Sequence, residues 1–202
     1  MNVLELNIGL GDVVKTKDGK FYEVKKIVDE DQIVLNSESG SYDACLNGGT
    51  VEITDVFKKN GTFKFFVYGS LLSGEANERV TEPKSRAKAT LVRKGILYSM
   101  GYFPALVLEG VPDIFAGSMV SDIAGELLIV DEEDAANMYK LEGYSKNRSE
   151  CLYDKLTVLV KLESGELDTA SVFCMSFDKI SRWNDVYPTK LNNWKDRCKW
   201  KM

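Results

Sequence analysis

Residues 125–144 read GELLIVDEEDAANMYKLEGY, an apolar run followed directly by a segment with helical spacing. The run at 125–130 predicts a buried strand, because it is short, apolar and followed by charged residues. Asp131 is a good N-cap, the acidic residues after it suit the positive end of a helix dipole, and Gly143 stands where a left-handed residue ends helices. This stretch therefore predicts a strand that leads into a helix bounded by Asp131 and Gly143.

Glu142 lies in the last turn of this expected helix. The negative end of the dipole disfavours an anionic side chain there, and burial beside Tyr139, Tyr144 or Met138 would add a desolvation cost. Both effects raise the pKa of a carboxyl group, and a pKa near neutrality suits a general acid or base. Exposed acids at helix ends are also common and cost little free energy, so the residue alone leaves both interpretations open.

A second apolar run, FKFFV at 63–67, continues into a loop that carries Gly69, Ser70 and Gly74. Small residues let backbone N–H groups approach a ligand closely, and such a nest favours a carboxylate or an oxyanion. The loop has neither the Gly-Lys-Ser/Thr sequence of a P-loop nor the G-x-G-x-x-G spacing of a dinucleotide site. Taken alone, it indicates a turn that can bind an anion.

The remaining segments of this half predict strands and a terminal helix. Residues 89–110 contain two expected strands, and residues 151–175 contain an expected hairpin that turns at Ser164-Gly165. Near the C-terminus we expect an amphipathic helix that packs on the core with one face, formed by Leu191, Trp194 and Cys198.

The first sixty residues show short β runs with turn signals about every ten residues. This pattern is typical of a small all-β barrel, and the opening GDVV with its hairpin weakly resembles SH3-like barrels. We place a small barrel module at 1–59, a main domain at 62–182 and a helical tail at 183–202. Because the first module carries no chemical motif, we expect it to be an accessory unit or a docking unit for a protein partner.

Composition excludes several kinds of chemistry. The 202 residues include no histidine, so Ser-His-Asp catalysis, Cys-His catalysis and His-ligated metal sites are excluded. The four cysteines are scattered without a C-x-x-C pair, which argues against a zinc site or a redox dithiol. We therefore expect no metal site, and any proton transfer falls to a carboxylate, Lys, Tyr or Cys.

The net charge and the lengths of the apolar runs limit the classes of partner that we expect for this protein. The net charge of −5 argues against nucleic acid, which binds clustered Lys and Arg. The apolar runs are far shorter than the roughly 20 residues that cross a bilayer, and the first residues do not resemble a secretory signal. We expect no membrane partner and a cytoplasmic location.

Five pieces of the chain, in order, carry a family resemblance: VYGSLLSG, ILYSMGYFPALV, GELLIVDEED, YKLEGY and LYDKLTVLVKLESGELDTASVF. Together they resemble the γ-glutamylcyclotransferase-like family, which includes AIG2-like and γ-glutamylamine cyclotransferase-like proteins, over about residues 63–175. The resemblance implies an α+β fold, a small mixed β-barrel with flanking helices. It also implies an enzyme that releases 5-oxoproline from γ-glutamyl amines or short γ-glutamyl peptides without a cofactor.

The same resemblance assigns roles to individual residues. Tyr68, Gly69, Ser70 and Leu71 match the Y-G-S/T-L loop, which offers backbone groups to the γ-glutamyl moiety. Glu142 falls on the acid/base glutamate of the L-E-G-Y-type helix end.

Two further residues fall at recurrent family positions. Tyr153 is expected in substrate binding, with an aromatic core residue as its alternative. Glu126 is read as a site residue or as a strand acid paired to a neighbour. The loop lacks the basic residue that often follows Y-G-x-L in the family, which leaves the substrate class open.

The chemistry of ring closure suits these residues. The α-amino group of a γ-glutamyl substrate must lose a proton to attack its own γ-carbonyl, and Glu142 can take that proton and return it to the leaving amine. The protein then has to fold the substrate and stabilise an oxyanion with loop N–H groups. The alternative is a non-catalytic small-molecule-binding or protein-interaction protein on the same fold.

Overall fold

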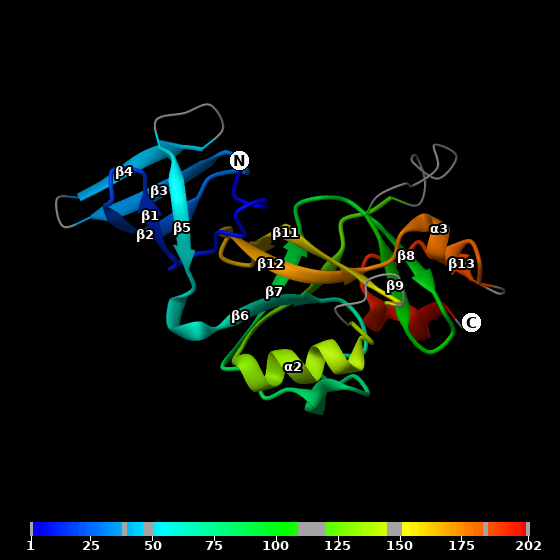
Figure 1. The fold of residues 1–202 in the computed structure, drawn as a ribbon. Helices are drawn as coiled ribbons and strands as arrows, with labels where there is room; N and C mark the ends of the chain where they lie inside the picture. The colour runs from blue at the N-terminus through cyan, green and yellow to red at the C-terminus, as the bar shows by residue number, and fades with distance from the viewer. Residues whose placement is uncertain are drawn as a thin grey trace.

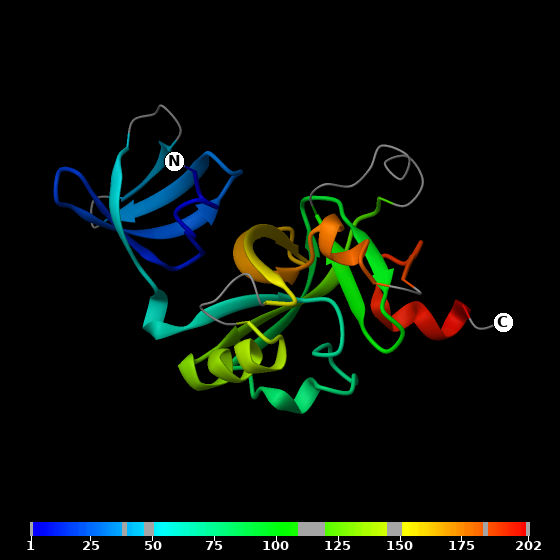
Figure 2. The ribbon, with the colours of Figure 1, turned by 45° about the vertical axis from the view of Figure 1, so that its right-hand side comes forward.

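The computed structural model describes residues 2–37, 40–46, 51–108, 120–144, 151–183 and 186–200. Strands from the first sixty residues gather at one end of the molecule, and the rest of the chain forms the larger part (Figure 1). The turned view in Figure 2 shows the same arrangement, with the C-terminus at the opposite end.

The larger part is built around a closed ring of strands in the order β11–β7–β10–β6–β12, with β12 pairing back to β11. All neighbours are antiparallel except β6 and β12, which run parallel where Phe65 meets Ser171. The ring is thus a mixed β-barrel, and the expected α+β fold is confirmed. Its strands are β6 (Phe63–Val67), β7 (Ser85–Leu91), β10 (Ala124–Val130), β11 (Asp154–Leu162) and β12 (Leu167–Cys174).

Successive side chains along these strands point to opposite faces of the sheet, so the strands contribute to two separate apolar cores. On β10, Leu127 joins an apolar cluster with side chains from every strand of the ring, which fills the barrel. The next residue, Leu128, joins a second cluster on the outside, together with Ala135 and Met138 of helix α2 (Glu132–Leu141). The helix lies between Asp131 and Gly143 as predicted, and the Asp131 carboxylate accepts the N–H of Asp134 at 3.1 Å.

A second, smaller sheet has the order β13–β8–β9. Its strands are β8 (Ile96–Ser99), β9 (Pro104–Val107) and β13 (Tyr187–Pro188). The two strands expected in residues 89–110 are in fact three, because the chain breaks after β7 and again before Pro104. The short helices of this part are η2 (Glu78–Val80) and α3 (Phe177–Ile180).

The C-terminal tail differs in detail from the expected helix. It begins with the strand β13, and its helix η4 (Trp194–Trp200) is a 3₁₀ helix. Leu191 and Trp194 are buried in the outer core, as their spacing predicted. The side chain of Cys198 lies outside the described residues.

The N-terminal strands are antiparallel in the order β5–β1–β2–β3–β4. They surround a core of their own, and no pairing between β4 and β5 occurs among the residues that the structure describes. Their bounds are β1 (Val13–Thr16), β2 (Phe21–Ile27), β3 (Gln32–Ser37), β4 (Gly40–Cys45) and β5 (Ile53–Phe57), followed by η1 (Lys59–Gly61).

Contacts cross the boundary that the sequence places near residue 60. β2 pairs with β12 through Ile27 and Leu167, and Leu159 of the barrel belongs to the N-terminal core. Lys64 on β6 forms a buried ion pair of 2.7 Å with Asp168 on β12, and the Asp168 carboxylate also accepts the N–H of Leu10 at 2.9 Å. The N-terminal strands therefore pack on the barrel.

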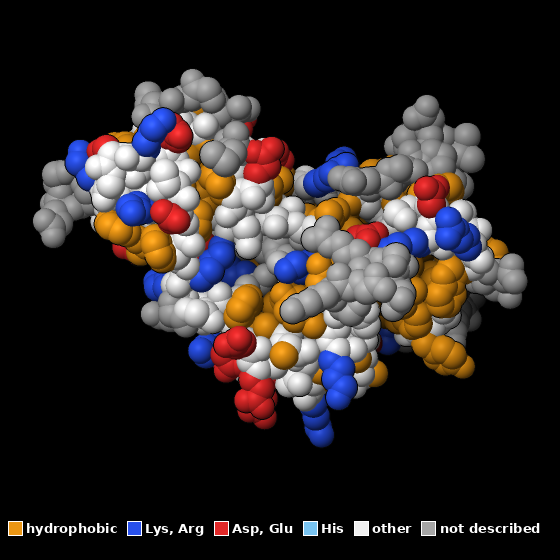
Figure 3. Space-filling model, viewed as in Figure 1, with side chains coloured by type: hydrophobic (Ala, Val, Ile, Leu, Met, Phe, Trp, Pro, Cys, Tyr) orange, Lys and Arg blue, Asp and Glu red, His pale blue; other side chains and the backbone are white. Residues whose placement is uncertain are grey.

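Acidic and basic side chains are interspersed on the face in Figure 3. Among the residues that the structure describes, no helix combines the length and the apolar character needed to cross a membrane.

Candidate active site

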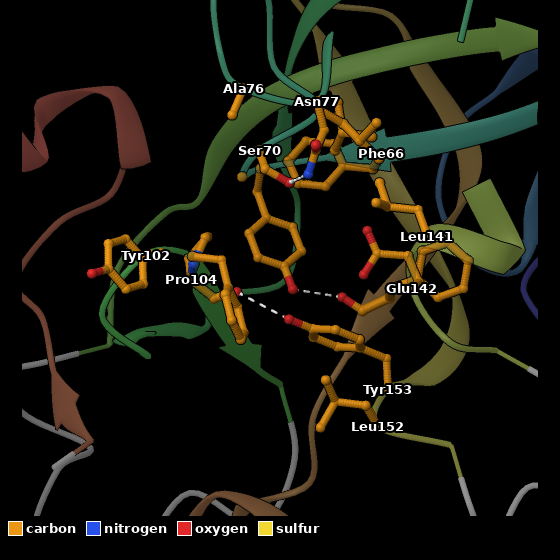
Figure 4. A pocket seen from close by; sticks show the side chains of 16 residues that line it. Phe66, Ser70, Ala76, Asn77, Tyr102, Pro104, Leu141, Glu142, Leu152 and Tyr153 are labelled. Atoms are coloured by element: carbon orange, nitrogen blue, oxygen red, sulfur yellow. Dashed lines mark hydrogen bonds between the residues drawn. The ribbon is translucent and has the colours of Figure 1, made fainter. Parts of the chain in front are cut away.

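A cavity of about 330 Å³ opens beside the barrel, where the loop after β6, the β8–β9 connection, the end of α2 and the start of β11 meet. Most of its lining is apolar or aromatic. All six residues that the sequence singled out as site residues lie in this lining, namely Tyr68, Gly69, Ser70, Leu71, Glu142 and Tyr153. Figure 4 shows Glu142 at one side of the cavity, Tyr153 below it, Ser70 and Asn77 above it, and Pro104 across from it.

The turn at the end of α2 presents Glu142 to this cavity. The N–H of Tyr144 donates to Tyr139 O at 2.8 Å and the N–H of Gly143 donates to Lys140 O at 3.2 Å, which together form a Schellman motif. Gly143 has a φ of +61°, the left-handed conformation that this motif requires. The rings of Tyr139 and Tyr144 pack 5.5 Å apart, so the chain reverses directly after Glu142.

Burial raises the pKa of the Glu142 carboxyl to about 7. In the described part of the chain, no ion pair or hydrogen bond reaches this carboxylate. Burial also raises the pKa of the Tyr68 and Tyr153 hydroxyls, and the nearby Glu142 carboxylate adds to both shifts. Both tyrosines are neutral near pH 7, and Glu142 is the member of this group that titrates there.

The residues at 68–74, which we call the pocket loop, expose backbone donors. Three successive carbonyls are occupied: Gly69 O accepts from Leu72 N (3.1 Å), Ser70 O from Asn77 N (2.9 Å) and Leu71 O from Arg86 Nη1 (3.1 Å). Among the described residues, the N–H groups of Gly69, Ser70 and Leu71 meet no protein acceptor. The loop thus lines the cavity with unpaired donors, the feature of an anion-binding nest.

A glycine is required at position 69 because the backbone there lies very close to the side chain of Pro104. A Cβ atom at this position would lie 2.8 Å from Cγ of Pro104 on β9, closer than such atoms pack. The glycine therefore lets the pocket loop lie against β9, and this contact closes one wall of the cavity.

The two tyrosines contribute differently to the site. The Tyr68 hydroxyl donates to Phe173 O at 2.7 Å and accepts the N–H of Leu106 at 3.2 Å, so it joins β12 to β9. Among the described residues, the Tyr153 hydroxyl makes one long hydrogen bond, to Pro104 O at 3.4 Å.

Several residues of the site were not foreseen from the sequence. Asn77 fixes Ser70 twice, through Ser70 O and through Ser70 Oγ, which accepts from Asn77 Nδ2 at 3.0 Å. Tyr102, which is 98% exposed, stands at the mouth of the cavity. Tyr102 lies within ILYSMGYFPALV, one of the pieces that carry the family resemblance, but the resemblance assigned this residue no role in the site.

Glu126 lies outside the cavity lining and is paired to neighbours, the structural alternative left open for it. Among the described residues, no group of three or more Cys, Asp or Glu side chains is placed to hold a metal ion.

Comparison with known proteins identifies the family of this chain. No curated protein matches the chain. Solved structures with partial similarity include an AIG2-like protein from Mus musculus (20% identity, 57% of this chain and 78% of that one, TM-score 0.45). Others are YkqA from Bacillus subtilis (23% identity, 69% and 43%, TM-score 0.45) and PH0828 from Pyrococcus horikoshii (13% identity, 69% and 94%, TM-score 0.42).

A family model gives stronger evidence than the similarity to these solved structures. The model described as "Gamma-glutamyl cyclotransferase, AIG2-like" matches residues 65–196, about two thirds of the chain. The match begins in β6, runs through the pocket loop and Glu142, and ends within η4. It extends past the expected limit near residue 175 and takes in the C-terminal tail. The chain therefore belongs to the γ-glutamyl cyclotransferase, AIG2-like family.

Proposed function

We propose that this protein is a cofactor-independent cyclotransferase that releases 5-oxoproline from a γ-glutamyl amine or a short γ-glutamyl peptide. One observation carries the proposal: a single cavity is lined both by a desolvated carboxyl group with a pKa of about 7 and by a loop whose N–H groups meet no acceptor among the described residues. Family membership supports the reaction class.

In the proposed reaction, the α-amino nitrogen of the γ-glutamyl group attacks its own γ-carbonyl carbon. A new C–N bond closes the five-membered ring, and the carbonyl oxygen becomes an oxyanion. The Glu142 carboxylate takes the proton of the attacking nitrogen and passes it to the departing nitrogen as the old amide bond breaks. The products are 5-oxoproline and a free amine.

Two features of the cavity would lower the barrier of this step. N–H groups of Gly69, Ser70 and Leu71 would stabilise the oxyanion or hold the substrate carboxylate, and such donors act strongly where water is excluded. Because both reacting groups belong to one molecule, walls that fold the γ-glutamyl chain back on itself supply much of the catalysis. The apolar lining suits that task.

A substrate panel with one substitution tests the proposal. Purified protein is incubated with γ-glutamyl amines and γ-glutamyl dipeptides, and 5-oxoproline is measured by mass spectrometry. We expect turnover with at least one compound, and a loss of about 10²–10⁴-fold in Glu142→Gln, the usual contribution of a general acid or base. Glu133→Gln, the same change on the exposed start of the same helix, is the matched control and should keep wild-type activity.

Two outcomes would overturn the proposal. Unchanged activity in Glu142→Gln would remove the acid/base role of this residue. A lack of turnover with every compound, together with a small molecule that stays bound through purification, would favour the non-catalytic alternative.

A further inference from the structure

Outside the cavity lining, a buried acid binds the pocket loop, and the proposed mechanism does not use it. Glu126 on β10 is 7% exposed. Its Oε2 accepts hydrogen bonds from Ser73 N at 3.0 Å, from Ser73 Oγ at 3.1 Å and from Arg86 Nη1. Its Oε1 accepts from Lys195 Nζ at 3.1 Å.

Arg86 links this acid to the centre of the loop. The same Nη1 that donates to Glu126 also donates to Leu71 O at 3.1 Å. Leu71 O and Leu72 N belong to one planar trans peptide, so they point in opposite directions. By holding Leu71 O, Arg86 keeps Leu72 N directed at Gly69 O, the hydrogen bond that closes the turn.

The closed turn sets the direction of the unpaired donors. Gly69 O and Ser70 N belong to the peptide that joins these two residues, so occupation of Gly69 O by Leu72 N turns Ser70 N–H the other way. In the same manner, the contact of Ser70 O with Asn77 N turns Leu71 N–H away from that contact. Since Ser70 and Leu71 line the cavity, these N–H groups are left for a ligand.

We propose that Glu126 is a positioning residue, which acts through Arg86 and Ser73 to hold the pocket loop with the Ser70 and Leu71 N–H groups directed into the cavity. The ionised form of Glu126 supports this role. Burial by itself would raise its pKa, but hydrogen bonds from Ser73, Arg86 and Lys195 outweigh that effect and lower the pKa. A carboxylate therefore persists against the pocket loop at neutral pH.

The kinetic test rests on the proposed function and uses Glu126→Gln, which keeps the side-chain shape but loses the charge that Arg86 and Lys195 face. We expect kcat/KM to fall at least tenfold, while the rise of activity with pH stays where Glu142 places it in the wild type. Glu163→Gln is the matched control, because Glu163 pairs with Lys88 at 3.1 Å on the exposed surface of the same barrel. It should stay within twofold of the wild type.

A binding test decides the inference independently of turnover. In ¹⁵N-labelled protein, 5-oxoproline should shift the amide signals of Ser70 and Leu71 in the wild type and in Glu163→Gln. In Glu126→Gln the affinity should fall at least tenfold. If Glu126→Gln lowers the folded fraction, Ser73→Ala removes one contact to the same carboxylate and should weaken binding two- to fivefold.

The outcomes separate the two proposals. If the wild type turns over no γ-glutamyl compound, the proposed function fails and the amide shifts still test the positioning role. Equal shifts and equal affinity in Glu126→Gln and the wild type would overturn that role. It would also be overturned if 5-oxoproline left both amide signals of the wild type unmoved.

Discussion

At the scale of single residues, the environment of Glu142 predicts how stability depends on pH. Its pKa is raised by burial to about 7, against about 4.5 in an unfolded chain, so the folded protein binds more protons between these values. Stability is therefore lost as pH rises from about 4.5 through 7, because the ionised carboxylate is poorly solvated. Glu142→Gln does not ionise, so we expect it to exceed the wild type in stability at pH 8 by on the order of 1–3 kcal/mol.

Urea unfolding at pH 5 and at pH 8 measures this difference. The gain of Glu142→Gln should shrink toward pH 5, while Glu133→Gln should match the wild type at both values. An equal effect of Glu142→Gln at the two pH values would show that the carboxyl titrates normally.

The same raised pKa predicts the pH dependence of activity. If the carboxylate is the base, the ionised form of Glu142 is the active one, and kcat/KM should rise with pH and reach half its plateau at about pH 7. Initial rates of 5-oxoproline release between pH 5 and 8 give this profile. A flat profile over that range would contradict the assignment.

Removal of the Tyr68 hydroxyl should lower the stability of the protein. Tyr68→Phe leaves Phe173 O and Leu106 N without their buried partner, and such unmade hydrogen bonds cost about 1–3 kcal/mol. Tyr102→Phe removes the same hydroxyl group from an exposed ring and should change stability by less than about 0.5 kcal/mol. Urea midpoints compare the two variants, and equal midpoints would show that the Tyr68 contacts contribute little.

At the scale of elements, the end of α2 couples helix termination to the site. Gly143→Ala places a side chain at a φ of +61°, which costs about 1–2 kcal/mol and disturbs the turn that presents Glu142. Gly165→Ala creates the same backbone conflict, at a φ of +89°, in the exposed β11–β12 turn.

We therefore expect both glycine variants to lose similar stability, whereas only Gly143→Ala loses kcat/KM, by at least tenfold, because small displacements of a reacting group are costly. Thermal unfolding and initial rates measure the two effects. Equal activity of the two variants would show that the Schellman turn does not position Glu142.

At the scale of the whole molecule, an ion pair within the barrel, between Lys64 on β6 and Asp168 on β12, also binds the N-terminal part through Leu10. Asp168→Asn leaves Lys64, whose side chain is 15% exposed, without its counter-charge, and breaking one partner of such a pair costs about 3–5 kcal/mol. Because Asp168 also binds the N–H of Leu10, the loss should weaken both parts together.

Two probes test this coupling. The tryptophans all lie after residue 180, so their fluorescence reports on the barrel side, whereas far-ultraviolet circular dichroism reports on all strands. The midpoints should coincide and fall together in Asp168→Asn, and Glu52→Gln, in an exposed pair with Lys17, should leave both unchanged. Two separate transitions in the wild type would show that the parts unfold independently.

Several features of this molecule are local enough to be read along the chain. The ends of α2 depend on Asp131 and Gly143, which act within one turn of the helix, and the β11–β12 hairpin depends on a glycine at its own turn. The strand β10 is a short apolar run, and the pocket loop is a run of small residues after another. Family resemblance, carried by motifs of the same short range, adds the expected roles of Glu142 and the pocket loop.

Other features needed the folded chain. Glu126 meets Arg86 and Lys195 over separations of 40 and 69 residues, and Lys64 meets Asp168 over 104. No local propensity encodes such partners, because closure of the barrel determines which strands become neighbours. For the same reason, residue order showed an acid at a helix end, whereas the cavity around it, and with it the raised pKa, arises from the packing of distant segments.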